Sequence, residues 1–192
     1  MRKITIEDTY ALVDKDLYEY LSQFSWTLRR GYATAYIDGQ NVDMHWLILE
    51  RRGGFQIDHK NRNILDNRKH NLRYATYVEN QMNTTSRLGT SDYKWVGYHQ
   101  LNGYWRVRVR VPGEAYSKEI SGFQCEHLAA LAGNMRAIAV ARHVGAREEF
   151  LLLNQVPRKY KKRFLARCNN TILERLETLG ITCKIVNEVL DD

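Results

Sequence analysis

Hydrophobic and polar residues alternate strictly from Tyr104 to Val111, which predicts a strand with one apolar and one polar face. The apolar face carries Trp105, Val107, Val109 and Val111, and the polar face carries Arg106, Arg108 and Arg110. Turns are predicted at Asn102-Gly103 and Pro112-Gly113, with a further strand near Tyr116–Ile120. Apolar residues at helical spacing from Glu126 to Val144 then predict a helix whose apolar face packs on the Trp/Val face of the sheet.

The N-terminal part of the chain shows short runs of β-type residues, at Lys3–Ile6, Tyr10–Val13, Tyr32–Ile37 and Asn41–Met44. Asp38-Gly39 separates the last two runs and is a favourable hairpin turn, because glycine accepts a positive φ. Apolar residues at helical spacing predict a short helix within Asp16–Phe24.

Residues 55–83 are rich in Asn, Asp and His. They predict a strand, a loop, a returning strand and a helix, at Gln56–His59, 60–71, Leu72–Ala75 and 76 onward. Thr76 and Glu79 have the spacing of a capping box, which marks the start of the helix. Asn80 then lies one turn into the helix, where it can face back toward Asp58 and His59.

This arrangement suits the hydrolysis of phosphodiester bonds. Asp58 offers an anionic oxygen and Asn80 an amide oxygen, both of which suit Mg²⁺, and His59 can deprotonate an attacking water. A calcium-binding loop is excluded because Lys60 and Arg62 would repel the ion. Two other interpretations stay open: Asp58-His59 as a hydrogen-bonded surface pair, and the Asn-rich loop as a series of Asx turns.

Residues 55–83 resemble the HNH motif of phage and intron-encoded homing endonucleases, with Asp-His, then Asn-Leu-Arg, then Asn. The resemblance implies a ββα-metal fold in which Asp58 and Asn80 are the metal ligands and His59 is the general base. Asn71 matches the middle asparagine that pins the loop across the motif.

Two further residues are site-adjacent candidates. Asn83 lies one more turn along the predicted helix than Asn80. His45 lies upstream of the motif, where similar proteins carry a histidine followed by an arginine. Trp46 stands in place of that arginine, so a phosphate contact there is in doubt; His45 can equally be a packed structural histidine.

Residues 91–154 resemble the Apetala-type ethylene-response-factor domain, a DNA-binding domain known fused behind HNH nucleases. The resemblance rests on Tyr93-Lys94-Trp95-Val96, Tyr104-Trp105-Arg106, Gly122-Phe123 and the alanine-rich helix that follows. It implies a three-stranded sheet that reads the major groove, with DNA-facing side chains at Lys94, His99, Arg106, Arg108 and Arg110. Trp95 departs from the family, which usually has glycine there; a merely solvated arginine face is the other interpretation.

Composition agrees with a nucleic-acid partner. The net charge of +7 and the pI of 9.3 favour a polyanion, and 44% hydrophobic residues indicate folded domains. No apolar run is long enough to span a bilayer, and the first residues lack a secretory signal, so we expect an intracellular protein. The resemblance to phage homing endonucleases implies a cytoplasmic protein of a bacterial host, encoded by a phage. The three cysteines offer neither a disulfide framework nor a CxxC zinc site.

The sequence therefore predicts an α+β protein of two modules. We expect an N-terminal β-rich region with the HNH motif (1–83), a linker (84–91), the DNA-binding domain (92–154) and a basic, partly helical extension (155–192). The expected function is that of a metal-dependent DNA endonuclease, in a homing role, using Mg²⁺ or Mn²⁺ on double-stranded DNA as a monomer or homodimer, with no small-molecule substrate. The alternatives are a DNA-binding protein with an inactive nuclease site, and a structural phage or RNA-binding protein.

Overall fold

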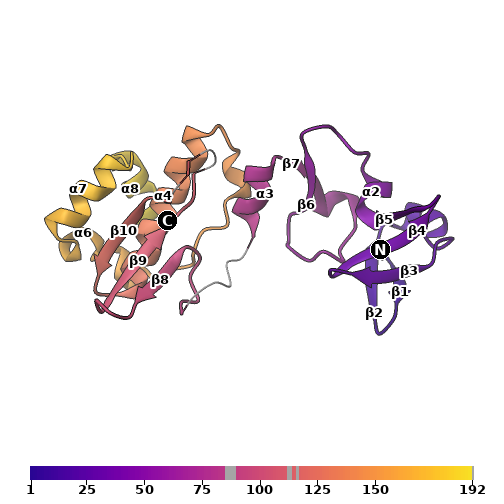
Figure 1. Ribbon diagram of the computed structural model, residues 1–192, viewed down its shortest axis with the longest axis horizontal. Coiled ribbons are helices and arrows are strands. Elements are labelled where there is room, and N and C mark those ends of the chain that lie inside the picture. Colours follow the sequence, from indigo (N-terminus) through magenta and orange to yellow (C-terminus); the bar gives the residue numbers. More distant parts are fainter. Residues whose placement is uncertain (85–89, 112–113, 116, 192) are drawn as a thin grey trace. The chain divides into compact units, whose positions relative to one another are not determined.

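The computed structural model describes residues 1–84, 90–111, 114–115 and 117–191 (Figure 1). The chain divides into two compact units, Met1–Asn83 and Thr84–Asp192. The linker expected at 84–91 falls largely outside the described residues, as does the turn expected at Pro112-Gly113. In the part of the chain that is described, no helix is both long and apolar enough to cross a membrane.

The first unit begins with antiparallel strands, in the hairpin β1 (Arg2–Ile6) and β2 (Thr9–Val13) and the sheet β3 (Trp26–Arg29), β4 (Tyr32–Ile37) and β5 (Gln40–Asp43). The predicted turn between β4 and β5 is confirmed: Asp38 and Gly39 both have positive φ, at 48° and 80°. Strand β3 was not predicted, and it pairs with β4 from Trp26↔Ala35 to Arg29↔Tyr32.

Two helical regions differ from the prediction. The helix expected within Asp16–Phe24 is a 3₁₀ turn, η1 (Lys15–Leu17), followed by α1 (Tyr18–Leu21). Met44, expected at the end of a strand, begins helix α2 (Met44–Ile48) and is fully buried. Trp26 ties β3 to α1, because its indole nitrogen donates to the carbonyl of Leu21 at 2.7 Å. The core of the unit is formed by buried residues from β1, β2, α1, β3, β4 and α2.

The rest of the first unit is the predicted hairpin and helix. Strands β6 (Gln56–His59) and β7 (Leu72–Ala75) match the prediction and pair antiparallel, and a 3₁₀ turn, η2 (Lys69–Asn71), precedes β7. Helix α3 (Tyr77–Asn83) follows. The capping box is confirmed, since Thr76 N donates to Glu79 Oε2 at 2.8 Å and Glu79 N donates to Thr76 Oγ1 at 3.3 Å.

The second unit contains the predicted three-stranded antiparallel sheet, in the order β10 (Glu119–Phe123), β9 (Tyr104–Arg108), β8 (Val96–His99). The third strand lies a few residues later than expected, and β9 ends at Arg108 and not at Val111. The apolar face is nevertheless buried as predicted, with Val107, Val109 and Val111 at 4% exposure or less.

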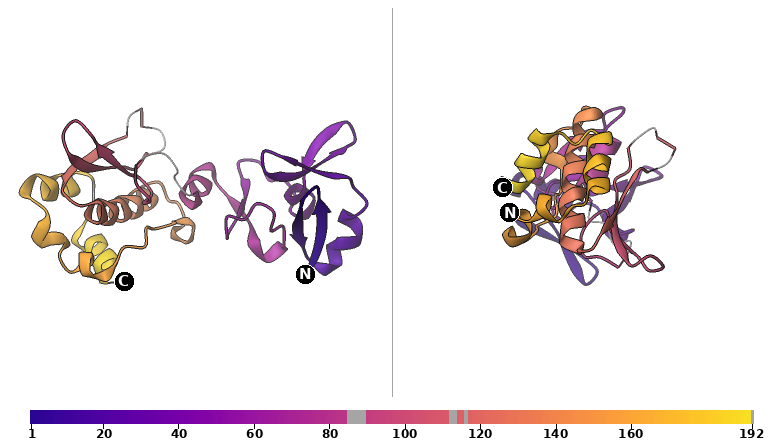
Figure 2. Two further views of the ribbon diagram at one scale, coloured as in Figure 1. Left: turned by 90° about the horizontal axis from the view of Figure 1, so that it is seen from below. Right: turned by 90° about the vertical axis from the view of Figure 1, so that its left-hand side faces the viewer.

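Helix α4 (Glu126–His143) packs against the sheet, but the expectation of one apolar face was too narrow. Buried residues lie on all its sides, including Asn134 and Arg136. The C-terminal region forms the 3₁₀ turn η3 (Glu148–Phe150) and the helices α5 (Arg158–Lys161), α6 (Phe164–Arg167), α7 (Asn170–Thr178) and α8 (Cys183–Asp191). Figure 2 shows the cause: α4 lies between the sheet and part of these helices, because α5 and α8 pack against α4, whereas α7 packs against β10. Arg136 Nη1 donates to the carbonyl of Leu179 at 2.6 Å, so the extension is part of this unit's core.

Candidate active site

The hairpin β6–β7 positions the two residues expected to do the chemistry. Asp58 pairs with Arg73 and His59 with Leu72 across the hairpin. Because neighbouring side chains of a strand point to opposite faces, the side chains of Asp58 and His59 lie on opposite faces of the hairpin and contact different residues. Both are buried, at 5% and 4% exposure, so Asp58-His59 is not a surface pair.

The Asp58 carboxylate is surrounded by hydrogen-bond donors. Arg73 Nε donates to Oδ2 at 2.8 Å, and Asn83 Nδ2 lies 2.9 Å from Oδ1 and 3.0 Å from Oδ2. Asn83 Nδ2 also donates to the backbone carbonyl of His59 at 3.0 Å. Asn83 therefore ties the end of α3 to both residues of the Asp-His pair.

Asn80 also joins α3 to β6, but through a different residue of the strand than Asp58. Its Nδ2 donates to Gln56 Oε1 at 2.6 Å, two residues before Asp58 along β6. The structure thus places Asn83, and not Asn80, beside Asp58. The signal in the sequence was the spacing of three residues between the two asparagines, which puts both on one helix face.

His59 is oriented by a residue that the sequence analysis did not single out. Its Nε2 lies 3.2 Å from Oδ1 of Asn67, which is 1% exposed. With Asn67 oriented so that its Oδ1 faces the ring, the proton of the neutral imidazole lies on Nε2 and the Nδ1 lone pair is available. Burial lowers the pKa of His59, while the hydrogen bond to Asn67 and the charges of Asp58 and Asp66 oppose that shift. The imidazole is thereby kept in its neutral form, which a base requires.

The loop between β6 and β7 is held by polar side chains. Asn71 is 3% exposed; its Oδ1 accepts from Asn61 N at 3.0 Å, and its Nδ2 donates to the carbonyl of Asp66 at 2.7 Å. Asn71 thus bridges the two halves of the loop. The Asx-turn interpretation holds for Asn61 and Asn63, whose side chains accept from the backbone two residues on. It does not describe Asn71, whose contacts span five and ten residues.

His45 lies next to His59, with ring centroids 5.4 Å apart and the Tyr32 ring also 5.4 Å away. It is 6% exposed, and burial, with smaller contributions from His59 and Arg51, lowers its pKa to about 3. His45 is therefore a packed, neutral histidine in contact with the site. It also lines a cavity of about 700 Å³, as does Asn80.

The donor set is compatible with a hard divalent cation. Asp58 supplies a carboxylate, and the amide oxygens of Asn80 and Asn83 are neutral oxygen donors on the adjacent helix face. Among the described residues, no group of three or more His, Cys, Asp or Glu side chains could hold a metal. A cation at Asp58 would thus have few protein ligands, and it would share the carboxylate with Arg73.

The residues expected to face DNA differ in exposure. Arg108 and Arg110 are exposed and Arg106 is half-buried. Lys94 is only 7% exposed, with its ammonium 4.5 Å from the Trp95 ring centroid, so the structure does not present it on the surface. His99 stacks on Tyr104 with ring centroids 5.2 Å apart.

A carboxylate lies within the arginine face. Glu119 Oε2 is 2.7 Å from Arg108 Nε and 3.4 Å from Arg106 Nη1. The mutual repulsion expected of stacked arginines is therefore partly offset within the protein. Trp95, where the Apetala-type domain usually has glycine, has a φ of +68°, a conformation that favours glycine.

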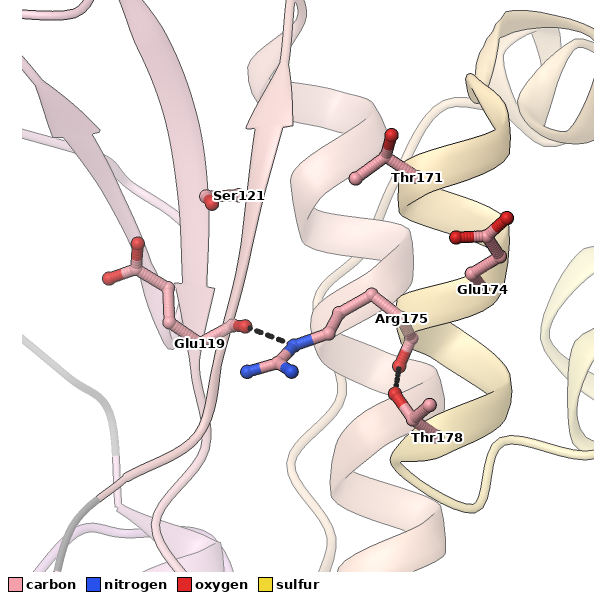
Figure 3. A pocket seen from close by; sticks show the side chains of 6 residues that line it. All are labelled: Glu119, Ser121, Thr171, Glu174, Arg175 and Thr178. Carbon is pink, nitrogen blue, oxygen red and sulfur yellow. Dashed lines mark hydrogen bonds between the residues drawn. The ribbon is translucent and has the colours of Figure 1, made fainter.

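A second cavity, of about 550 Å³, lies between β10 and α7 (Figure 3). It is lined by Glu119, Ser121, Thr171, Glu174, Arg175 and Thr178. Arg175 Nε donates to the backbone carbonyl of Glu119 at 3.1 Å, which links α7 to the strand that carries this carboxylate. The sequence analysis did not predict a contact between the C-terminal extension and the sheet.

Comparison with protein families gives one match: residues 45–82 match a family described as HNH endonuclease. The matched segment begins at His45 and contains Asp58, His59, Asn71 and Asn80, and it ends one residue before Asn83. The chain has no significant match among curated proteins, nor among solved structures.

Proposed function

Because residues 45–82 are an HNH endonuclease domain, which marks a hydrolase of DNA phosphodiester bonds, we propose that this chain is a metal-dependent endonuclease with His59 as its general base. The observation that carries the proposal is the contact between His59 Nε2 and Asn67 Oδ1. It leaves Nδ1 as the acceptor for a proton from water, which is the task of a general base.

In the proposed reaction the Nδ1 of His59 takes a proton from a water molecule that attacks the phosphorus. The bond to the 3′ oxygen breaks and this oxygen takes up a proton from solvent, which leaves a 5′-phosphate and a 3′-hydroxyl. A divalent cation, Mg²⁺ or Mn²⁺, would be held by Asp58 with an asparagine amide, and it supplies stabilisation of the charge on the phosphate and on the departing oxygen. Asn71 and Asn67 act as positioning residues, because they fix the loop and the imidazole.

We further propose that the second unit binds double-stranded DNA through the face of its sheet that carries Arg106, Arg108 and Arg110. This proposal is supported by the exposure of Arg108 and Arg110 and by the likeness to the Apetala-type domain. Such a pairing of modules is consistent with a homing endonuclease of a phage or another mobile element.

The test is plasmid cleavage by the full chain with Mg²⁺, with Mn²⁺ and with excess EDTA, comparing wild type, His59→Ala and His70→Ala. His70 is an exposed histidine of the same loop and serves as the control. We expect His59→Ala to lower the rate by about 10²-fold or more, and His70→Ala to keep it. Cleavage that persists in EDTA would overturn the metal requirement. A wild-type protein that binds DNA without cutting it would instead support the alternative of an inactive nuclease site.

A further inference from the structure

The cavity beside His45 has a strongly positive lining. Arg30, Arg51 and Arg52 line it, and all three are exposed. In the described part of the chain none of them forms an ion pair with a carboxylate. Asp43 also lines the cavity, and its Oδ1 accepts a hydrogen bond from the Thr34 hydroxyl at 2.6 Å. Three guanidinium groups therefore face one carboxylate.

Two of these arginines are held by aromatic rings and not by acids. The Arg51 guanidinium lies 3.5 Å from the centroid of Trp46, and that of Arg52 lies 4.2 Å from the centroid of Tyr74. A ring orients a guanidinium without consuming its N–H donors, which point outward in the plane of the group and match the oxygens of a phosphate. The arginines are thus fixed in place with their hydrogen-bonding capacity intact.

The cavity adjoins the residues proposed to act on the scissile bond. His45 lines it and lies against His59, with ring centroids 5.4 Å apart. Asn80 and Gln56 also line it, joined by their 2.6 Å hydrogen bond. A nucleic-acid strand that passed through the cavity would run beside β6, the strand that carries Asp58 and His59.

From this charge, orientation and position we propose that the cavity is the binding site for the phosphodiester backbone of the strand that is cut. Arg51 and Arg52 are its principal phosphate ligands, and Arg30 is a third. This inference rests on the proposed endonuclease function. It assigns the positioning of the scissile strand to the N-terminal unit. The sheet of the second unit has a separate proposed role, which is to supply affinity for DNA.

The test compares two full-length double variants with the same loss of charge. Arg51→Gln/Arg52→Gln removes the proposed ligands, and Arg2→Gln/Arg29→Gln is the control, because both control arginines are exposed in the same unit and lie outside the cavity. Binding to a labelled duplex is measured by fluorescence anisotropy over a series of salt concentrations, in EDTA, so that it does not depend on cleavage. Circular dichroism of both variants checks that they fold.

We expect the cavity variant to bind roughly tenfold more weakly than the control, with a salt dependence shallower by about two units of slope, one for each phosphate contact. Arg51→Lys/Arg52→Lys should keep most of the slope, because the charges remain. Affinity and slope equal to those of the control would overturn the proposal.

Single-turnover cleavage in Mg²⁺ by the same proteins separates this proposal from the endonuclease function. The cavity variant should need more DNA for half-maximal rate than the Arg2→Gln/Arg29→Gln control, whose rate should match that of wild type. If wild type does not cut at all, the endonuclease function fails, and the anisotropy measurements still decide whether the cavity binds DNA.

Discussion

Arg73 and Asp58 form a buried ion pair across the β6–β7 hairpin, with Arg73 Nε 2.8 Å from Asp58 Oδ2 and side-chain exposures of 13% and 5%. The two residues are direct register partners, so the pair is built into the hairpin. Asp58 is also the residue expected to hold the divalent cation. The guanidinium and the cation must therefore share one carboxylate. The effect of the cation on stability should then depend on whether Arg73 is present.

Replacing Arg73 with Gln should make the stability of the protein depend on metal. Removal of Arg73 takes away the ion-pair partner of Asp58 while Asn83 still donates to the carboxylate, which costs roughly 1–3 kcal/mol. We expect Arg73→Gln to lower Tm in EDTA, and Mg²⁺ to raise Tm more in this variant than in wild type. Thermal unfolding followed across a Mg²⁺ titration gives both quantities.

Arg68→Gln provides the matched control. Arg68 pairs with Asp66, a 2.6 Å contact to a carboxylate that is equally buried but is not a proposed metal ligand. Its loss should also lower Tm, without recovery in Mg²⁺. Equal responses of the two variants to Mg²⁺ would show that Asp58 does not hold the cation.

Asn80 and Asn83 should be separable by alanine substitution. Asn83 is 6% exposed and donates to Asp58 and to the His59 carbonyl, so Asn83→Ala should reduce both stability, by about 1–3 kcal/mol, and cleavage. Asn80→Ala loses one exposed hydrogen bond, so it should keep Tm and lose metal-dependent cleavage if Asn80 is a metal ligand. Chemical denaturation and single-turnover cleavage test this, with the exposed Gln81→Ala as control. Wild-type cleavage by Asn80→Ala would leave Asn83 as the amide ligand.

The site shows which structural features local sequence patterns can predict and which they cannot. The ends of β6 and β7 and the capping box of α3 follow from neighbouring residues, because alternation and cap spacing are local signals. Which asparagine meets Asp58 depends on the packing angle of α3 against the hairpin, and a spacing of three residues does not determine that angle. Asn67 was missed because its partner is eight residues away across a loop, and loop geometry is set by the polar contacts of Asp66 and Asn71.

In the second unit, too, local patterns predicted some features and missed the contacts between distant segments. The burial of Val107, Val109 and Val111 followed from strict alternation, whereas the C-terminal extension was predicted only to be basic and partly helical. Within that extension, α5 and α8 pack against α4, and α7 packs against β10. Such contacts join segments separated by tens of residues, so periodicity within one helix could not reveal them.

His45 should make the N-terminal unit sensitive to acid. Burial lowers its pKa from the ordinary 6.5 to about 3. The unfolded chain therefore binds a proton that the folded chain does not, and stability falls as pH falls from about 6.5 toward 3. Each pKa unit corresponds to about 1.4 kcal/mol. Between pH 7 and pH 4.5, we expect the Tm of His45→Gln to fall less than the Tm of wild type. The Tm of the exposed control, His70→Gln, should fall as much as that of wild type. A His45→Gln variant with the wild-type pH dependence would assign the effect to other groups.

Glu119 should restrain the DNA affinity of the arginine face. Its carboxylate lies 2.7 Å from Arg108 and 3.4 Å from Arg106, so a phosphate must compete with it for both guanidinium groups. We expect Glu119→Gln to strengthen duplex binding several-fold and to steepen its salt dependence, because a competing charge is removed. Arg108→Ala should weaken binding by about 1–3 kcal/mol if it contacts a base edge. Neither change touches the hydrogen bond that holds α7 to the sheet, since Arg175 binds the backbone carbonyl of Glu119. Glu177→Gln, which removes the same charge from an exposed position on α7, is the control in anisotropy titrations across salt. If Glu119→Gln and Glu177→Gln bind DNA alike, and Arg108→Ala binds as wild type does, this face of the sheet does not contact DNA.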